Sequence, residues 1–297
     1  MIERIIDLSD LPARVSTRHG QLLIKTGAEE ERSVPLVEVA TLIVSNPTVL
    51  VTQGALAGLL EAGGVFVLCD RRRMPVGMMA AMEGHHLHAE RLRLQIEAGE
   101  PARKQAWQQT VRAKVLAQAA VLQQRTGEDR GLRTMAARVR SGDPDNVEAQ
   151  AARKYWTAAF GPAFRRDRDA GGANALLNYG YMALRAVIAR AIVAAGLHPA
   201  LGIQHKNRYN AYSLADDLME PFRPIVDLRV LAWLDAGKAA EVDVESKRHL
   251  LGALLARYPL QGEQCTLFDC AAATAVSLVR HLEGKQKQLQ FIDDVIQ

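Results

Sequence analysis

Several absences narrow the class to which this 297-residue protein can belong. Three cysteines and no Cys-x-x-Cys pair are too few for a disulfide framework or a zinc ribbon. The most apolar long stretch, residues 183–203, is interrupted by two arginines and a histidine, which excludes a membrane span. The first residues include an acid where a secretory signal needs basic residues and then an apolar run. We therefore expect a soluble, cytoplasmic protein with no membrane partner.

The common catalytic signatures are also missing. The sequence contains no phosphate-binding P-loop, no dinucleotide-binding glycine motif after a strand, no nucleophile elbow and no His-Glu-x-x-His zinc motif. His85, His86 and His88 resemble a metal cluster at first sight. Neighbouring histidines cannot all face one ion on a regular element, and no carboxylate or cysteine pattern completes the set. We interpret them as surface or interdomain residues, with metal ligation as the lesser alternative and their role left open.

Positive charge is concentrated in one part of the chain. The net charge is +4, yet residues 1–89 hold 8 Lys and Arg against 10 Asp and Glu, whereas residues 91–140 hold 11 against 4. Such a run is usually a solvated helix face. The alternative is a phosphate-binding surface, because clustered cations gain affinity by releasing counterions from nucleic acid and the arginine fork suits phosphate oxygens. Charge alone makes nucleic acid a candidate partner.

Two kinds of local pattern divide the chain. In the first part, short β-branched runs such as 21–25 and 41–44 are bounded by Gly, Pro and Asn, which predicts strands, with one helix over 52–62. In the second part, Ala, Leu, Arg and Gln dominate with a helical period. We therefore predict an α+β protein, with a β-rich, sandwich-like domain at 1–84 and a larger all-α domain at 85–297.

The densest chemistry lies between residues 176 and 227. A connection rich in glycine and proline leads to His205. Ser213 and Asp216 follow with the spacing of a capping box, so we expect a short helix to begin there and Asp216 to serve its start. Pro221 disfavours helical backbone in the residue before it, so the helix is expected to end at that point.

Two further acids lie close to this histidine in the sequence. Asp217 and Glu220 are three residues apart and would share one helix face. One interpretation is an ion-pair network, in which Glu220 meets Arg223 and His205 packs against Tyr209. The other is a divalent-metal site, because carboxylate oxygens with one imidazole suit Mn²⁺ or Mg²⁺. The surrounding basic residues would then hold a polyanionic substrate.

A third ligand would have to come from elsewhere in the chain. Glu148 follows the turn-rich loop at 141–146 and is expected in the first turn of an Ala-rich helix. An acid at that position ordinarily complements the helix dipole, and nothing in the local sequence overrules this role.

Four segments of the same region carry a family resemblance. They read Leu-Asn-Tyr-Gly-Tyr at 177–181, Gly-Leu-His-Pro at 196–199, Leu-Gly-Ile-Gln-His at 201–205 and Leu-Ala-Asp-Asp-Leu-Met-Glu-Pro-Phe-Arg-Pro at 214–224. In this order and spacing they closely resemble the signature of the CRISPR-associated adaptation endonuclease/integrase, the universal spacer-acquisition protein of those systems. The resemblance extends over essentially the whole chain, and the compact form is similar to type II members.

The resemblance implies a metal site and assigns its ligands. The family holds Mg²⁺ or Mn²⁺ with a glutamate, a histidine and a further acid, which correspond here to Glu148, His205 and Glu220. Asp217 is the secondary candidate for a ligand. The basic residues expected to contact DNA are Lys206, Arg208 and Arg223.

The resemblance also implies the reaction and the partners. A 3′-hydroxyl of a short DNA fragment would attack a phosphodiester at the repeat boundary, so the double-stranded spacer fragment and the CRISPR repeat are the substrates. The N-terminal domain would form a homodimer, the helical domain would be catalytic, and two dimers would flank a small ferredoxin-like partner in a heterohexamer. Two alternatives stay open: a non-catalytic DNA-binding scaffold and a branched-DNA repair nuclease.

Overall fold

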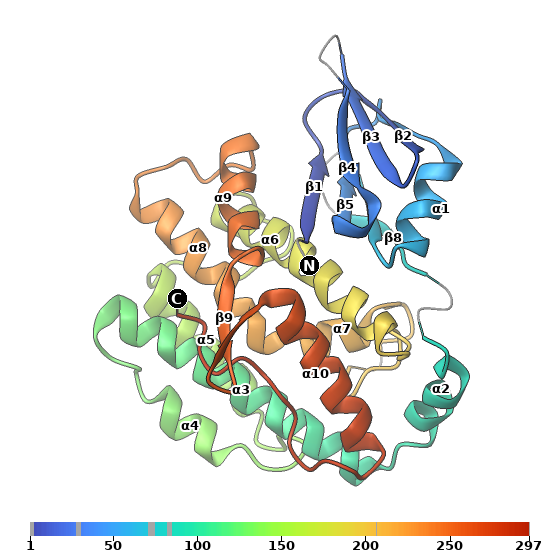
Figure 1. The fold of residues 1–297 in the computed structure, drawn as a ribbon. Coiled ribbons are helices and arrows are strands. Elements are labelled where there is room, and N and C mark those ends of the chain that lie inside the picture. The colour runs from blue at the N-terminus through green and yellow to red at the C-terminus, as the bar shows by residue number, and fades with distance from the viewer. Residues whose placement is uncertain (1–2, 28–30, 71–74, 82–84, 206, 297) are drawn as a thin grey trace. The chain divides into compact units, whose positions relative to one another are not determined.

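The computed structural model describes the whole chain except residues 1–2, 28–30, 71–74, 82–84, 206 and 297. The chain divides into two compact units, residues 1–86 and residues 87–297 (Figure 1). The first unit is rich in strands and the second is mainly helical, so the predicted α+β class is confirmed.

The N-terminal unit contains two four-stranded sheets with the strand orders β1-β5-β7-β8 and β4-β3-β2-β6. The elements are β1 (Arg4–Leu8), β2 (Ala13–Arg18), β3 (Gln21–Thr26), β4 (Arg32–Pro35), the 3₁₀ turn η1 (Leu36–Glu38), β5 (Val39–Val44), β6 (Leu50–Val51), α1 (Gln53–Glu61), β7 (Val65–Cys69) and β8 (Pro75–Met79).

Both sheets and α1 contribute to one core in this unit. Val15 and Leu22 come from one sheet, Leu42 from the other and Leu59 from α1, and each of these side chains is fully buried. Helix α1 confirms the prediction of a helix over 52–62. The helix starts at this point because the Thr52 hydroxyl accepts the Ala55 N–H and so caps it. The sandwich-like arrangement follows from this shared core.

The second unit is built around two long helices, α3 and α6 (Figure 1). Helix α6 packs against α8, α9 and α10, whereas α3 packs against α4, α5, α8 and α10. The elements are α2 (His88–Glu97), α3 (Glu100–Thr126), α4 (Leu132–Arg138), α5 (Val147–Phe160), α6 (Ala173–Ala194), α7 (Ser213–Leu218), the 3₁₀ turn η2 (Glu220–Phe222), α8 (Arg223–Asp235), α9 (Val244–Leu254), β9 (Arg257–Leu260), β10 (Glu263–Thr266) and α10 (Leu267–Leu282).

The apolar composition of helix α6 matches its central position in the second unit. Within the described parts of the chain it is the one helix long and apolar enough to cross a membrane, but 83% of that apolar window is buried inside the protein. A helix that is hydrophobic around most of its circumference is expected in the core of a large domain.

The second unit is not entirely helical, which corrects the all-α prediction. Strands β9 and β10 form an antiparallel hairpin, and the buried Tyr258 on β9 donates its hydroxyl to the Ala253 carbonyl at 2.8 Å. The two residues of the turn, Gln261 and Gly262, have φ of 53° and 81°. Two successive positive φ values match the strand twist in a two-residue hairpin loop, and Gln-Gly is a weaker signal for it than Asn-Gly.

Candidate active site

One face of α3 forms the base of the candidate site. Trp107, Thr110, Lys114 and Gln118 recur every three or four residues, which places them on the same side of the helix. All four side chains are buried, although only Trp107 is mainly apolar. A buried helix face that carries an ammonium and an amide requires polar partners from neighbouring elements.

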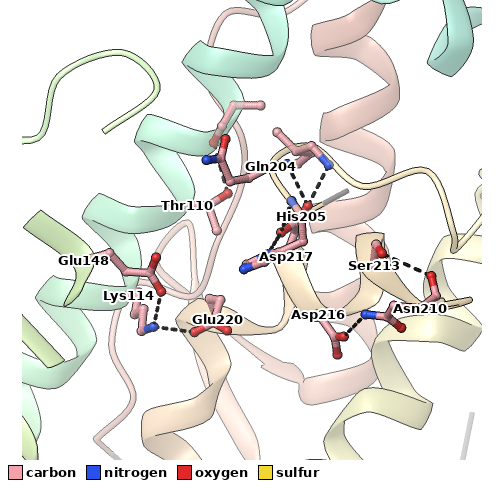
Figure 2. Close-up of polar contacts among 12 residues, drawn as sticks. Thr110, Lys114, Glu148, Gln204, His205, Asn210, Ser213, Asp216, Asp217 and Glu220 are labelled. Atoms are coloured by element: carbon pink, nitrogen blue, oxygen red, sulfur yellow. Dashed lines mark hydrogen bonds and ion pairs between the residues drawn. The ribbon is translucent and has the colours of Figure 1, made fainter. Parts of the chain in front are cut away.

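Those partners are the two predicted glutamates. The Lys114 ammonium nitrogen lies 2.6 Å from Glu148 Oε1 and 2.6 Å from Glu220 Oε2, so one cation separates two carboxylates from distant parts of the chain (Figure 2). Burial acts to lower the pKa of Lys114, but the charges of Glu220 and Glu148 outweigh it and the pKa is raised. The lysine is therefore charged.

Glu148 is positioned by the start of α5. It lies in the first helical turn, as predicted, and its backbone N–H donates to Asp143 Oδ2 at 3.0 Å. The other oxygen of Asp143 accepts the Val147 N–H at 2.8 Å, while Asn146 caps the next amide. These side chains satisfy helix N–H groups that have no partner within the helix, and so they fix the point from which Glu148 projects.

Glu220 lies outside the short helix to which the sequence assigned it. Helix α7 already ends at Leu218, and Glu220 begins the separate 3₁₀ turn η2. Its Oε1 accepts from Arg223 Nε at 2.9 Å. Burial acts to raise the pKa of Glu220, but Arg223 and Lys114 lower it to about 2, so the carboxylate is ionised.

Asp217 supports the loop that carries His205. Its fully buried carboxylate accepts the N–H of Ile203 at 2.6 Å and of Gln204 at 2.9 Å, and it also pairs with His205 Nδ1 (Figure 2). A Cβ on Gly202 would come within 2.9 Å of Asp217 Oδ2 and closer still to the His205 carbonyl oxygen, so this loop requires glycine. With both oxygens engaged in this way, Asp217 positions His205.

His205 shares an electrostatic environment with both glutamates. The bond to Asp217 raises its pKa, burial opposes this, and the charges of Asp217, Glu220 and Glu148 raise it further. Its ring meets Trp107 edge-on, with centroids 5.6 Å apart, and not Tyr209 as one interpretation of the sequence expected. The half-exposed imidazole is thus held between Trp107 on α3 and Asp217 on α7.

The predicted capping box at the start of α7 is wrong. Tyr212 occupies the N-cap position, and no side chain caps the helix. Asp216 instead accepts from Arg185 at 2.8 Å and from the Asn210 amide at 2.7 Å, while the Ser213 hydroxyl donates to the Asn210 carbonyl. Arg185 on α6 takes the carboxylate because a partly buried guanidinium is a stronger partner than a neutral backbone N–H.

The three predicted DNA contacts have different surroundings. Lys206 lies outside the described residues. Arg208 is exposed, and its guanidinium lies over the ring of Tyr209, itself 80% exposed. Arg223 is largely buried between Glu220 and the ring of Tyr181, 4.6 Å from the ring centroid. Arg208 is therefore open to a ligand from solvent, whereas Arg223 belongs to the interior of the site.

The arginines of segment 91–140 fall into two groups. Arg112 donates to the Val139 carbonyl at 2.9 Å and Arg125 pairs with Asp235, so part of the charge is used to join helices. The arginines of this segment whose side chains are exposed include Arg93, Arg133 and Arg138. These exposed arginines are accessible to the phosphates of a nucleic acid.

Glu148, His205 and Glu220, the three predicted ligands, are not arranged around a common point that could hold a metal ion. Across the described ranges, no group of three His, Cys, Asp or Glu side chains is arranged to hold an ion. The Lys114 ammonium lies where the two carboxylates converge. Glu220 Oε2 is buried, and that ammonium lies 2.6 Å from it. Carboxylate oxygens and one imidazole are donors that suit Mg²⁺ or Mn²⁺, so the residues present fit such an ion.

His85, His86 and His88 have contacts of their own. The rings of His85 and His86 stack on each other with centroids 4.4 Å apart. His88 begins α2, and its Nδ1 lies 3.2 Å from the Gly196 carbonyl oxygen. His88 therefore has a structural partner.

A pocket of about 230 Å³ opens beside Glu220. Its charged lining consists of four cations and two acids, and its other residues are Gln118, Trp156 and Tyr181; the charged residues are Lys114, Arg166, Arg168, Arg223, Glu220 and Asp227. This excess of positive charge suits a phosphate group.

Sequence reasoning did not find Lys114 or Asp143. Lys114 lies between Thr110 and Gln118 on the helix face that also carries Trp107, and this position could have indicated that the lysine is buried. A buried lysine requires an acid partner. The signal for Asp143 was its distance from Glu148, because an acid just before a helix accepts the first N–H groups.

Comparison with known proteins identifies a family for this chain. A family model described as CRISPR associated protein Cas1 matches residues 8–258. A curated relative, the CRISPR-associated endonuclease Cas1 of Neisseria meningitidis, is 41% identical over 245 residues, which is 81% of this chain and 80% of the relative.

Solved structures share the fold. A casposase bound to integration product has a TM-score of 0.81 at 23% identity and covers 96% of this chain and 92% of its own. A Cas6-RT-Cas1–Cas2 complex has a TM-score of 0.76 at 18% identity, with 97% of this chain matching 36% of that chain. The family model and the curated relative show that this chain belongs to the Cas1 family of CRISPR-associated endonucleases.

Proposed function

We propose that this protein is the metal-dependent integrase of CRISPR adaptation, which joins the 3′-hydroxyl of a short DNA fragment to a phosphodiester at the repeat boundary. The observation that carries the proposal is the convergence of Glu148 and Glu220 on a single cation, close enough to His205 for their charges to act on its pKa. Two carboxylates and an imidazole near a cationic pocket match the needs of phosphoryl transfer.

Glu148, Glu220 and His205 would hold the ion, either Mg²⁺ or Mn²⁺. When bound, it would polarise the scissile phosphate and offset the charge that develops on the attacking and leaving oxygens. Asp217 keeps His205 Nδ1 engaged, which directs the other ring nitrogen, Nε2, toward a ligand. Arg223 keeps Glu220 ionised, as a metal ligand must be.

DNA would approach from the exposed basic side. Arg208 and Tyr209 form a cation and aromatic pair in solvent, suited to a phosphate and an unstacked base. Lys206 precedes this pair in the sequence, and the exposed arginines of segment 91–140 extend the charge. Arg223, which lines the pocket, would act on a phosphate only from inside the site. A structure of the same fold, the crystal structure of a TtCas1-DNA complex, supports a DNA substrate.

The N-terminal unit would form the homodimer and the helical unit would be catalytic. Leu68 and Met79, on the neighbouring strands β7 and β8, are exposed apolar residues that a second copy would cover. A Cas6-RT-Cas1–Cas2 complex of the same fold supports Cas2 as a partner. We propose that this partner is the small ferredoxin-like protein and that two dimers flank it in a heterohexamer. Array DNA lies in the cytoplasm, and we propose that the protein acts there.

Strand joining on array DNA tests the function. Purified protein with Mn²⁺, a short duplex with 3′-hydroxyl ends and a supercoiled plasmid carrying the repeat should give covalently joined product. Binding without joining would instead indicate a scaffold, and junction cutting without array preference would indicate a repair nuclease. The variants Glu148→Ala, His205→Ala and Glu220→Ala should abolish joining.

A surface acid provides the control for these variants. Glu245 on α9 is 61% exposed and pairs with Lys238, so Glu245→Ala removes a carboxylate without touching the site. It should join DNA at the normal rate. Undiminished joining by His205→Ala would defeat the assignment of the site.

A further inference from the structure

Lys114 occupies the place between the two glutamates that a divalent cation would need. We propose that this lysine is an internal counter-ion, which holds the metal-free site together and must be displaced when the metal binds, so that it sets the metal affinity. This inference rests on the proposed function, because it assumes that Glu148 and Glu220 are ligands.

Charge balance explains why a cation is present in the metal-free site. Glu148 and Glu220 have side chains that are 24% and 9% exposed, and each has an oxygen 2.6 Å from the same ammonium. Two ionised carboxylates this close together, with little water around them, repel each other strongly unless a positive charge lies between them. Lys114 supplies that charge from the rigid middle of α3.

The contact with Glu220 is one that a metal ion could replace. The Lys114 ammonium pairs with Glu220 Oε2 across 2.6 Å, and this oxygen is buried from solvent. A divalent ion carries twice the charge of an ammonium and approaches carboxylate oxygens to about 2.1 Å, closer than an ammonium can. Arg223 binds the other oxygen, Oε1, so it can stay in place during the exchange.

The displaced ammonium has a second acceptor within reach. Gln118 lies one helical turn beyond Lys114 on the same face of α3. Its Oε1 is buried and has no hydrogen-bond partner, and both side chains line the pocket of about 230 Å³ beside Glu220. A lysine that turns from the glutamates to Gln118 would satisfy that oxygen and leave Oε2 of Glu220 to the metal.

Calorimetric titration of Mn²⁺ into the metal-stripped full-length protein at pH 7.5 tests the proposal. Lys114→Met and Lys114→Gln should each bind Mn²⁺ about tenfold more tightly than the wild type, since no charged partner has to be displaced. Lys247→Met, which removes a buried lysine on α9 outside the site, should leave the affinity unchanged. Thermal unfolding without metal should show a lower Tm for Lys114→Met, with a larger rise on adding Mn²⁺.

Glu148→Gln separates failure of this inference from failure of the metal site. If Mn²⁺ binding weakens in Glu148→Gln but is unchanged or weaker in both Lys114 variants, the metal site stands and the counter-ion role is wrong. If Glu148→Gln binds Mn²⁺ as the wild type does, or the wild type binds none, the ligand assignment fails and the inference fails with it. Lys114→Gln keeps a polar group at this position, so its Mn²⁺ titration tests the counter-ion role if Lys114→Met does not fold.

Discussion

The carboxylate of Asp217 pairs with Nδ1 of His205 and also accepts the N–H groups of Ile203 and Gln204, so one buried side chain fixes both the ring and the loop that carries it. The sequence indicated Asp217 as a secondary metal ligand. Its contacts favour a different role, that of the acid which orients His205, the proposed metal ligand.

Asp217→Asn should therefore lower metal affinity and joining by about 10–100-fold, the usual effect of removing an outer partner of a ligating histidine. An amide offers one acceptor oxygen where the carboxylate offers two, so the loop and the ring cannot both be held. Mn²⁺ titration and initial joining rates measure the effect. Asp169→Asn makes the same charge change on an exposed loop and should change neither. Normal Mn²⁺ affinity in Asp217→Asn would contradict the positioning role.

Gly202→Ala should disturb the same loop by crowding. The added methyl group would overlap the His205 carbonyl and press on Asp217, so we expect about 1–3 kcal/mol of destabilisation together with slower joining. Urea unfolding and joining assays test this. Gly252→Ala is the matched control, because a Cβ there meets nothing within 4 Å and alanine favours the helix. Wild-type stability in Gly202→Ala would show that the loop shifts freely.

Asp143→Ala should affect stability and activity together. Loss of its two hydrogen bonds to the start of α5 is expected to cost about 1 kcal/mol and to release the turn that directs Glu148. Asp243→Ala removes the corresponding cap of α9, which carries no proposed ligand, and should leave joining intact. Equal joining rates for the two variants would show that the α5 cap has no part in placing Glu148.

The protonation of Asp227 makes the free energy of unfolding depend on pH. Burial raises its pKa from 3.8 to about 6, although the hydroxyls of Tyr181 and Tyr155 and the charges of Arg223 and Arg166 oppose this. A folded pKa above the unfolded value means that the folded state binds the proton more tightly, so the stabilisation is complete below pH 3.8 and is lost as pH rises through about 6.

Asp227→Asn removes this titration. From pH 8 to pH 5 the wild type should gain about 1.4 kcal/mol of unfolding free energy relative to the variant, a value that follows from the two pKa values. Urea unfolding of both proteins at each pH measures the difference. A difference that stays constant, or that shrinks on acidification, would show that burial does not raise this pKa.

The sequence was informative where local patterns decide the structure. Strand-rich and helix-rich regions, the helix over 52–62 and the place of Glu148 in a first turn all follow from periodicity, capping and turn residues, which act over a few neighbours. The motif around His205 also located the region of the site. No local pattern, however, states which distant acid a lysine will meet.

The errors have a common physical cause, which is competition from distant groups. Asp216 had suitable spacing for a cap, but Arg185 on α6 offered a charged partner that cannot be recognised from four neighbouring residues. Lys114 was counted as one of many cations because its burial depends on how α3 packs against α5 and η2. The β9–β10 hairpin was missed because Gln261 in left-handed backbone is uncommon.

Helix α3 contacts the histidine through Trp107 and both glutamates through Lys114. Each added residue turns the following part of an α-helix by about 100°. A single insertion or deletion between positions 107 and 114 would therefore swing one contact away from the other, even if every side chain of the site were retained. The length of this short helical segment is thus as restrictive as the identity of its residues, and chains that differ there in length should be inactive however well their remaining sequence matches.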